Sequence, residues 1–473
     1  MAGSTLNDLS SLHAALDGMV RFDGDGVEVL DERAVRTHLI DQLIWTAVFG
    51  TGDAQDASRW LIRVLAPALG AWPASIQSLY MAAGRNEYAN VTTPAINLRT
   101  MTYDLARTVF RAAHATDSKQ ILFELARSEM GYTAQQPSEY ASAVLAAAIK
   151  ENWQGPVFIQ GDHYQANAKK YGTDPKAEIE AVADVARNAI SAGYGNIDID
   201  SSTLVDLSFP TLKEQQRANY VNTAYLTKVI RDAEPSSLTI SIGGEIGEVG
   251  KFNSTIEDLD AFMEGYLEEL ERIGIENDAS LTGISKISVQ TGTSHGGVVM
   301  ADGSIKEVSV DFETLGKLSE VAKAKYGMGG AVQHGASTLP ESAFGHFAEV
   351  NAVEVHLATA FQNAIYDSEA FPQELLFDIY AYLGKTFGDA RKPDQTDAQF
   401  NYTNRKNAFG PFKHQFWTLP DSVKAIILDE LQPQFEQIMR ELKVAGNGAL
   451  VDTYINRVDT PVLAPDRLIA SRS

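Results

Sequence analysis

Eight short apolar runs alternate with helical patterns from residue 91 to residue 357, and this alternation limits the fold more than any other feature of the chain. Strands that alternate with helices pair in parallel through right-handed crossovers. The runs that predict strands are Val91–Leu98, Gln120–Leu125, Val157–Gln160, Gly195–Asp200, Leu238–Gly243, Gly283–Thr291, Gly330–Gln333 and Ala352–Leu357. The patterns that predict helices include 101–114, 177–192, 212–233, 256–274, 312–325 and 340–350.

Eight such units fit a closed (β/α)8 TIM barrel, and an open doubly wound α/β sheet is the alternative. Polar residues follow nearly every predicted strand. A barrel gathers the ends of all its strands at one mouth, whereas an open sheet binds ligands at a single switch point. The pattern therefore favours the barrel.

Segments without this alternation flank the barrel on both sides. Residues 1–88 show helical spacing and no strand pattern, so we expect an N-terminal helical extension there. We assign 89–385 to the catalytic barrel and 386–473 to a C-terminal helical appendage, with one helix over 421–445. We expect the two flanking segments to cap the barrel bottom or to form an oligomer interface.

Composition narrows the chemistry and the partners of the chain. Among its 473 residues there is no cysteine, so a metal must be bound by His, Asp or Glu. The 62 acidic side chains outnumber the 39 basic ones, which argues against nucleic-acid binding. We see no apolar run near 18 residues and no signal-peptide pattern, so we expect no membrane association and a cytoplasmic location.

Potential metal ligands are concentrated where the predicted strands end. Three of the nine histidines, His163, His295 and His334, lie within a few residues of a strand end. A catalytic zinc ion typically has three protein ligands and one open position, so we propose these three as zinc ligands. A single histidine in such a loop is more often a hydrogen-bonded loop residue, and the hypothesis depends on the three together. Other polar residues at strand ends are Asp162, Asp200, Glu245 and Thr359.

Small residues follow two of these histidines. His295 precedes Gly296, and His334 precedes Gly335 and, two residues later, Ser337. A residue without a Cβ lets backbone amides approach an anion closely. Both segments are therefore typical of a metal ligand beside an oxyanion or phosphate cradle.

These motifs occur in the order and rough spacing of one family. Gly161-Asp162-His163, Ile197–Ser202, Gly244–Gly247, Thr291–Gly296 and His334–Ser337 resemble the motifs of class II, zinc-dependent ketose-bisphosphate aldolases. The resemblance covers about residues 90–367. It implies reversible aldol cleavage of a ketose bisphosphate, such as fructose 1,6-bisphosphate, through an enediolate that zinc stabilises. It also implies a homo-oligomer, either a dimer or a tetramer.

The resemblance assigns roles to individual residues. It implies that His163, His295 and His334 bind zinc and that Asp162 is the acid/base for the hydroxyl next to the cleaved bond. Asp162 could instead orient His163 as a hydrogen-bonded carboxylate. Asp200 and Glu245 match alternative or outer metal ligands. Positions implied for substrate, phosphate and a monovalent cation are Asn97, Gly296, Gly335, Ser337, His356, Thr359 and Arg405.

One position departs from the family pattern, and the roles of two other groups of residues are not decided by the sequence. His356 stands where the last strand of the family has an asparagine, which leaves the identity of the ketose open. The loop glutamate that removes a proton from carbon is either Glu248 or Glu257. Arg405 lies in a basic segment that is either an anion site for the far phosphate or an ordinary solvated loop.

Two other functions compete with the zinc aldolase. A Schiff-base aldolase on the same barrel would use Lys286 as its nucleophile, but it leaves the three histidines unexplained. The chain also resembles the barrel subunit that supports a separate catalytic chain in tagatose-bisphosphate aldolase assemblies. Such a subunit needs no zinc ligands, so the metal content of the purified protein distinguishes it from a zinc aldolase.

Overall fold

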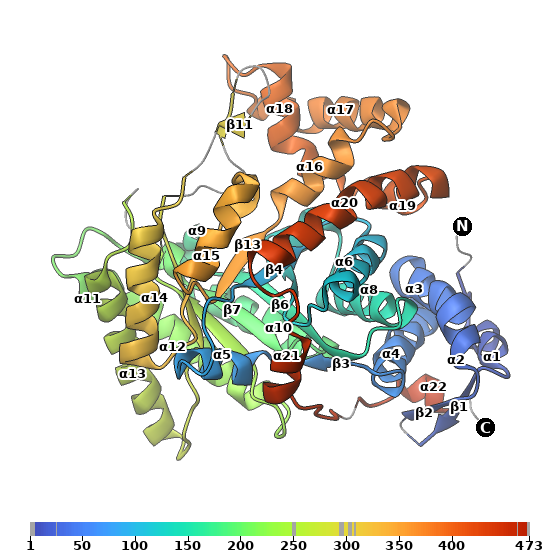
Figure 1. The fold of residues 1–473 in the computed structure, drawn as a ribbon, viewed down its shortest axis with the longest axis horizontal. Helices are drawn as coiled ribbons and strands as arrows, with labels where there is room; N and C mark the ends of the chain where they lie inside the picture. Colours follow the sequence, from blue (N-terminus) through green and yellow to red (C-terminus); the bar gives the residue numbers. More distant parts are fainter. Residues whose placement is uncertain are drawn as a thin grey trace.

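A closed barrel of eight parallel strands forms the centre of the computed structural model, which describes residues 5–24, 26–247, 252–292, 298–300, 305–306, 309–460 and 462–470 (Figure 1). Its strands are β4 (Thr93–Asn97), β5 (Leu122–Ala126), β6 (Gly155–Gln165), β7 (Asn196–Asp200), β8 (Ser241–Glu245), β9 (Lys286–Val289), β12 (Ala331–Gln333) and β13 (Glu354–Leu357). β13 pairs with β4, and β7 pairs with β6, which closes the ring. The predicted (β/α)8 barrel is confirmed, and each predicted strand overlaps one barrel strand.

Helices surround the barrel, and local signals set their ends. α10 begins at Pro175 after Asp174, whose side chain accepts from Ala177 N, and it ends before Gly193 at φ 101°. A capping box of Thr255 and Asp258 begins α13. The helices that follow the barrel strands are α6 (Thr102–Thr116), α7 (Glu129–Thr133), α8 (Pro137–Lys150), α9 (Ala168–Thr173), α10 (Pro175–Ala192), α11 (Leu212–Gln215), α12 (Arg217–Ala233), α13 (Ile256–Glu276), α14 (Phe312–Tyr326), α15 (Phe344–Glu349) and α16 (Thr359–Asp367).

The N-terminal segment is not purely helical, which corrects the prediction for residues 1–88. It contains α1 (Leu9–Leu16), α2 (Glu32–Ala34), α3 (Ile40–Phe49), α4 (Gly52–Ala68) and α5 (Gln77–Gly84). It also contains a hairpin of β1 (Val20–Asp23) and β2 (Gly26–Val29), and a further strand, β3 (Ala71–Ala74). These strands have four residues each, which is too short for their alternation to stand out from helical spacing.

Strand β3 extends the sheet at the bottom of the barrel. It pairs in parallel with the first residues of β6, from Gly155 to Phe158. β7 pairs with β6 only from Gln160 onward, so β3 fills the space before β7 begins. The Asn196 side chain at the start of β7 connects this strand to the residues that follow β3, because its Oδ1 accepts from Ile76 N at 2.9 Å.

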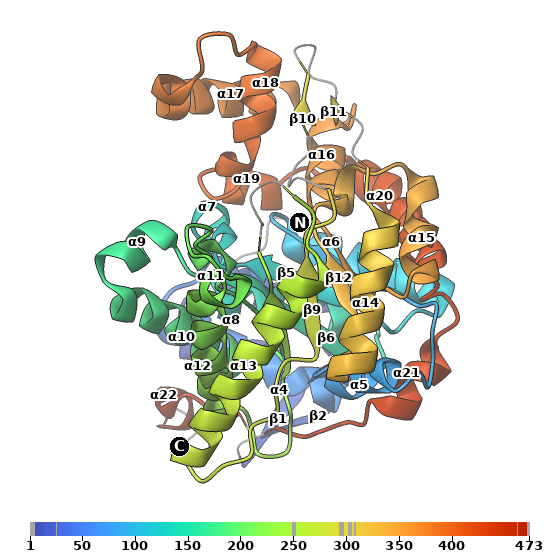
Figure 2. The same ribbon diagram turned by 90° about the vertical axis from the view of Figure 1, so that its left-hand side faces the viewer.

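The C-terminal segment covers two regions of the barrel. The helices after α16 are α17 (Gln373–Phe387), which spans the expected boundary at residue 385, α18 (Asp397–Asn404), α19 (Lys413–Trp417), α20 (Asp421–Glu441), α21 (Gly448–Tyr454) and α22 (Asp466–Ala470). In both ribbon views α17 and α18 stand beyond one end of the barrel, near the hairpin of β10 (Val298–Val299) and β11 (Ile305–Lys306) (Figure 2). The chain then returns to the N-terminal helices, where Trp60 Nε1 donates to Val462 O at 3.0 Å. Among the helices that the structure describes, none is long and apolar enough for a bilayer.

Candidate active site

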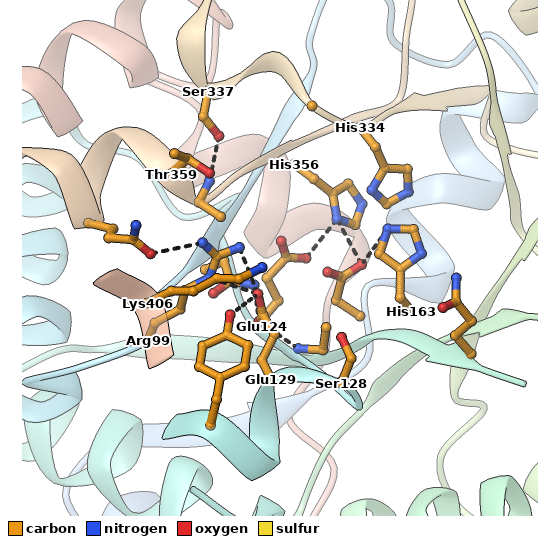
Figure 3. A pocket seen from close by; sticks show the side chains of 18 of the residues that line it. Arg99, Glu124, Ser128, Glu129, His163, His334, Ser337, His356, Thr359 and Lys406 are labelled. Atoms are coloured by element: carbon orange, nitrogen blue, oxygen red, sulfur yellow. Dashed lines mark hydrogen bonds and ion pairs between the residues drawn. The ribbon is translucent and has the colours of Figure 1, made fainter. Parts of the chain in front are cut away.

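A pocket of about 360 Å³ opens at the carboxyl ends of the barrel strands (Figure 3). Active sites of this fold lie at this end, because loops from all eight strands meet there. Eight residues predicted from the sequence line the pocket: Asn97, Asp162, His163, His334, Gly335, Ser337, His356 and Thr359. Three others, Glu248, His295 and Gly296, lie outside the described residues.

A bulge in β6 turns two consecutive side chains toward the pocket. The register of β6 against β7 shifts between Gly161 and Tyr164, and His163 has a φ of 39°. In a regular strand Asp162 and His163 would face opposite sides, but both line the pocket here. Gly161 permits the bulge, because a Cβ at this position would overlap the ring of Tyr164.

Asp162, His163 and His334 bring three potential metal-binding atoms together. One atom of each lies within 4.8 Å of the others, and the two imidazole rings are 4.1 Å apart between centroids. Imidazole nitrogen and carboxylate oxygen are zinc ligands, so this donor set fits a zinc ion. His334 Nε2 also lies 3.0 Å from Ser288 Oγ.

Asp200 and Glu245 lie on the other side of the His163 ring. Each places a carboxylate oxygen 3.0 Å from His163 Nδ1. Burial works to lower the pKa of His163, but Asp162 and Glu245 raise it well above its usual value. Burial raises the pKa of Glu245 to about 7, and Asp200 adds to this shift while His163 opposes it. The pair can orient His163 for a metal on its Nε2 side, or ligate a metal themselves.

Lys286 lies below the pocket in the barrel interior and is engaged by two carboxylates. Its Nζ is 2.6 Å from Glu354 Oε1, 2.9 Å from Asp198 Oδ1 and 2.8 Å from Gln160 Oε1. Burial would lower the pKa of Lys286, but Asp198 and Glu354 outweigh it and raise the pKa. A Schiff-base nucleophile must be an unprotonated amine, so this environment argues against that role.

His356 connects this interior layer to the pocket. Its Nδ1 lies 2.9 Å from Glu124 Oε2 and 3.2 Å from Asp162 Oδ1, and its Nε2 lies 2.7 Å from Glu354 Oε1. Its ring is 4.0 Å from that of His334, and Figure 3 shows His163, His334 and His356 side by side. Burial raises the pKa of Glu124 to about 7, and Asp162 adds to this shift.

Glu124 was missed by the sequence analysis, although β5 carried a signal for it. Its strand reads Leu122-Phe-Glu-Leu-Ala126, and a carboxylate within such an apolar run has to be paired or functional. All five residues of β5 are buried.

The far side of the pocket combines a helix N-terminus with small and hydroxyl residues. Gly335 has a φ of 71°, and Ser337 Oγ accepts from Ala358 N at 2.6 Å just before α16 begins at Thr359. Helix N-termini and exposed backbone amides attract anions. This end of the pocket therefore suits a phosphate group.

Two further cations line the pocket: Arg99, which the sequence analysis missed, and Lys406, which belongs to the basic segment predicted around Arg405. Arg99 donates to Glu129 Oε1 at 2.7 Å, and Glu129 also accepts from Asn97 Nδ2 at 2.6 Å. Lys406 Nζ lies 5.5 Å from the centre of the Tyr132 ring. These side chains come from the loop after β4 and from the segment after α18, so no single sequence motif contains them.

Arg405 and Glu257 are not among the described residues that line the pocket. Arg405 donates to Asp367 Oδ1 at 2.7 Å, and its guanidinium packs on the rings of Tyr366 and Tyr402. Glu257 is exposed in the first turn of α13, where a carboxylate stabilises the helix dipole.

Comparison with known proteins gives a family match and distant structural likenesses. A family model for fructose-bisphosphate aldolase class-II matches residues 74–404. A solved structure described as a probable tagatose 6 phosphate kinase from Sinorhizobium meliloti 1021 is 15% identical, with a TM-score of 0.52 over 77% of this chain and 99% of that chain. A fructose-bisphosphate aldolase from Campylobacter jejuni is 17% identical, with a TM-score of 0.44 over 78% of this chain and 95% of that chain. A search of curated proteins found no match.

The structural likeness at a TM-score of 0.52 supports the barrel fold alone. The family match is broader evidence, because residues 74–404 make up well over half of the chain and include all eight barrel strands. The chain belongs to the class-II fructose-bisphosphate aldolase family.

Proposed function

We propose that the protein is a zinc-dependent aldolase that cleaves and forms a carbon–carbon bond in a ketose phosphate, with fructose 1,6-bisphosphate as the first substrate to test. The observation that carries this proposal is the convergence of Asp162, His163 and His334 in the pocket at the barrel mouth. A supporting subunit without catalysis would have no need of this donor set.

We assign the zinc ion to His163 and His334, with His295 as the third ligand. When bound, zinc would act as a Lewis acid that polarises the ketone and stabilises the negative charge released as the bond breaks. Asp200 and Glu245 contact the His163 ring at its Nδ1, and its Nε2 lies 3.9 Å from Asp162 Oδ1, so we assign the metal to Nε2. They therefore fix the orientation of this ligand.

Asp162 is the proposed acid/base for the hydroxyl next to the cleaved bond. It would accept the hydroxyl proton during cleavage and return it during condensation. Its Oδ1 lies 3.2 Å from His356 Nδ1, so the carboxylate is held between the two histidines. Glu248 and Glu257 remain the two proposals for proton transfer at carbon, and the exposed position of Glu257 in α13 favours testing Glu248 first.

Phosphate recognition is divided between the two sides of the pocket. We assign one phosphate to Gly335, Ser337 and the start of α16, with Gly296 as a further contributor. At the other side Arg99 and Lys406, in place of Arg405, are the cations available to a second anionic group. Arginine offers a bidentate fork to phosphate, and lysine adds a point charge.

The test measures zinc content and retro-aldol cleavage of fructose 1,6-bisphosphate in the same preparations. We expect about one tightly bound zinc per chain at the proposed three-histidine site. His334→Ala should lose both this zinc and activity, whereas Asp162→Asn should retain this zinc and lower kcat by roughly 10²–10⁴-fold. EDTA should abolish activity, and added zinc should restore it.

The matched control is His346→Ala, because His346 is an exposed histidine on α15 outside the pocket. It should keep both zinc and activity. Folded protein that binds no zinc would contradict the proposal. Zinc-loaded protein that cleaves neither this sugar nor other ketose phosphates would also contradict it.

A further inference from the structure

A second cavity, of about 420 Å³, lies away from the barrel mouth and shares no lining residue with the pocket there. It is formed by α4, the start of α8, the end of α10 and residues 462–465, and α4 packs against α8 (Figure 1). Among its described lining residues are two arginines, Arg59 and Arg63, and no aspartate or glutamate. The chain as a whole has a net charge of −23, so this local excess of positive charge favours an anionic ligand.

The two arginines lie one helical turn apart on α4 and therefore on the same face of the helix. Arg59 donates from Nε to Ala47 O at 2.9 Å and from Nη1 to Ser138 Oγ at 3.2 Å. Arg63 donates from Nη1 to the carbonyl oxygen of Ala192, the last residue of α10. Neither guanidinium forms an ion pair with a described carboxylate, and like charges at this spacing repel each other.

Arg63 is held in place without a counter-charge. Gly193 makes room for it, because a Cβ at that position would overlap the guanidinium. The bond to Ala192 uses one N–H donor of Arg63, and the described residues offer the other donors no partner. Burial lowers the pKa of Arg63 to about 10, and no described carboxylate opposes this shift. A cation removed from water is stable when it is paired, so an anion from solution would stabilise this one.

The first turn of α8 adds further donors to the cavity. Gln136, Pro137 and Ser138 all line it, and no side chain caps the N-terminus of this helix. The amides and the dipole at such a helix end attract anions. Glu139, in the same turn, does not line the cavity and pairs with Lys413. The cavity therefore combines two guanidinium groups with an uncapped helix N-terminus.

We propose that this cavity binds phosphate, either free or carried by a small metabolite, between the side chains of Arg59 and Arg63 and the start of α8. Guanidinium groups match the oxygens of phosphate, and hydrogen bonds between charged partners are the strong ones. Leu145, Val462 and Leu463 line other parts of the cavity and leave apolar contacts for an organic group. The site is separate from the barrel mouth, so it does not depend on aldolase activity.

The test counts phosphate bound per chain, by equilibrium dialysis of the full-length protein against radiolabelled inorganic phosphate. The double variant Arg59→Met/Arg63→Met should bind one phosphate fewer than the wild type, whatever the barrel mouth binds. Arg63→Met alone should weaken this site about tenfold or more, because hydrogen bonds between charged partners are lost. Arg187→Met is the matched control and should bind like the wild type, since Arg187 lies on α10 outside the cavity and pairs with Glu180 and Asp184.

Ser138→Asp provides an independent variant. A carboxylate at this position would pair with Arg59 and interact favourably with the dipole of α8. The variant should therefore unfold at a higher temperature than the wild type in phosphate-free buffer, and it should lose the same phosphate. It replaces the arginine variants if these do not fold.

Competition identifies the source of the phosphate. Glucose 6-phosphate that displaces the ion at a lower concentration than unlabelled inorganic phosphate would identify a phosphorylated metabolite as the ligand, and the reverse order would identify the free anion. Glucose should displace nothing. A phosphate count equal to that of the wild type, in the folded double variant or in Ser138→Asp, would overturn the proposal.

Discussion

At the scale of single residues, Lys286 is a buried counter-ion, whereas the alternative of a Schiff-base aldolase would need it as a nucleophile. Lys286 is only 1% exposed, and its ammonium group lies between Asp198 and Glu354. Charges buried this deeply are stable only when they are paired. Lys286 therefore supports the carboxylates below the pocket, and His356 joins this layer to Asp162.

Lys286→Met should lower the free energy of unfolding by about 3–5 kcal/mol, because Asp198 and Glu354 would stay buried without their cation. Urea unfolding measures this change. Lys317→Met is the control, since Lys317 pairs with Glu313 on the surface of α14, and such pairs contribute about 0–1 kcal/mol. A reduced covalent adduct at Lys286, formed with substrate and borohydride, would contradict the counter-ion role and favour the Schiff base.

The sequence located some site residues and missed others for a physical reason. His334 directly follows β12, and His163 lies near the carboxyl end of β6, so the strand pattern alone predicted both at the barrel mouth. Arg405 and Lys406 are neighbours in the chain, and only packing decides which one lines the pocket. Arg405 is buried, and its guanidinium pairs with Asp367 and packs on the rings of Tyr366 and Tyr402.

At the scale of elements, β3 is a strand that the helical spacing of residues 1–88 did not predict. It lies beside β6, and Asn196 at the start of β7 donates from its Nδ2 to Ala74 O at 3.3 Å. Gly195 is required there, because a Cβ at this position would overlap the carbonyl oxygen of Ala74. The closing of the barrel bottom therefore depends on a residue more than one hundred positions away from β3.

Gly195→Ala should displace β3 and destabilise the protein by about 1–3 kcal/mol, since backbone atoms must move to relieve the overlap. The midpoint of thermal unfolding should fall accordingly. Gly384→Ala in α17 is the control, because a Cβ there meets open space and alanine favours helix by up to about 1 kcal/mol. Equal unfolding midpoints for Gly195→Ala and wild type would show that β3 does not contribute to stability.

At the scale of the whole molecule, the carboxylates at the barrel mouth make the stability of the metal-free protein depend on pH. The pKa values of Glu124 and Glu245 are raised from 4.5 to about 7, first of all by burial. Between these values the folded state holds more protons than the unfolded state, so stability is lost as the pH rises. Each group accounts for a decrease on the order of 3 kcal/mol.

EDTA-treated protein should therefore be less stable to urea at pH 8 than at pH 5. Zinc should restore more stability at pH 8, because metal ligands must be deprotonated to bind. Glu245→Gln should flatten the pH dependence of the metal-free protein, since the amide does not ionise. Metal-free stability that rises from pH 5 to pH 8 would contradict these pKa directions.

The sequence by itself determined the barrel, the position of its eight strands, and the two histidines near the carboxyl ends of β6 and β12. These features are local, because hydrophobic period and turn residues act over a few positions. The tertiary structure decided the rest: the bulge that turns Asp162 and His163 to one side, the pairing of Lys286, the donors around His356 and the cations Arg99 and Lys406. Each of these depends on atoms brought together from distant segments, and a local sequence pattern does not predict contacts between such segments.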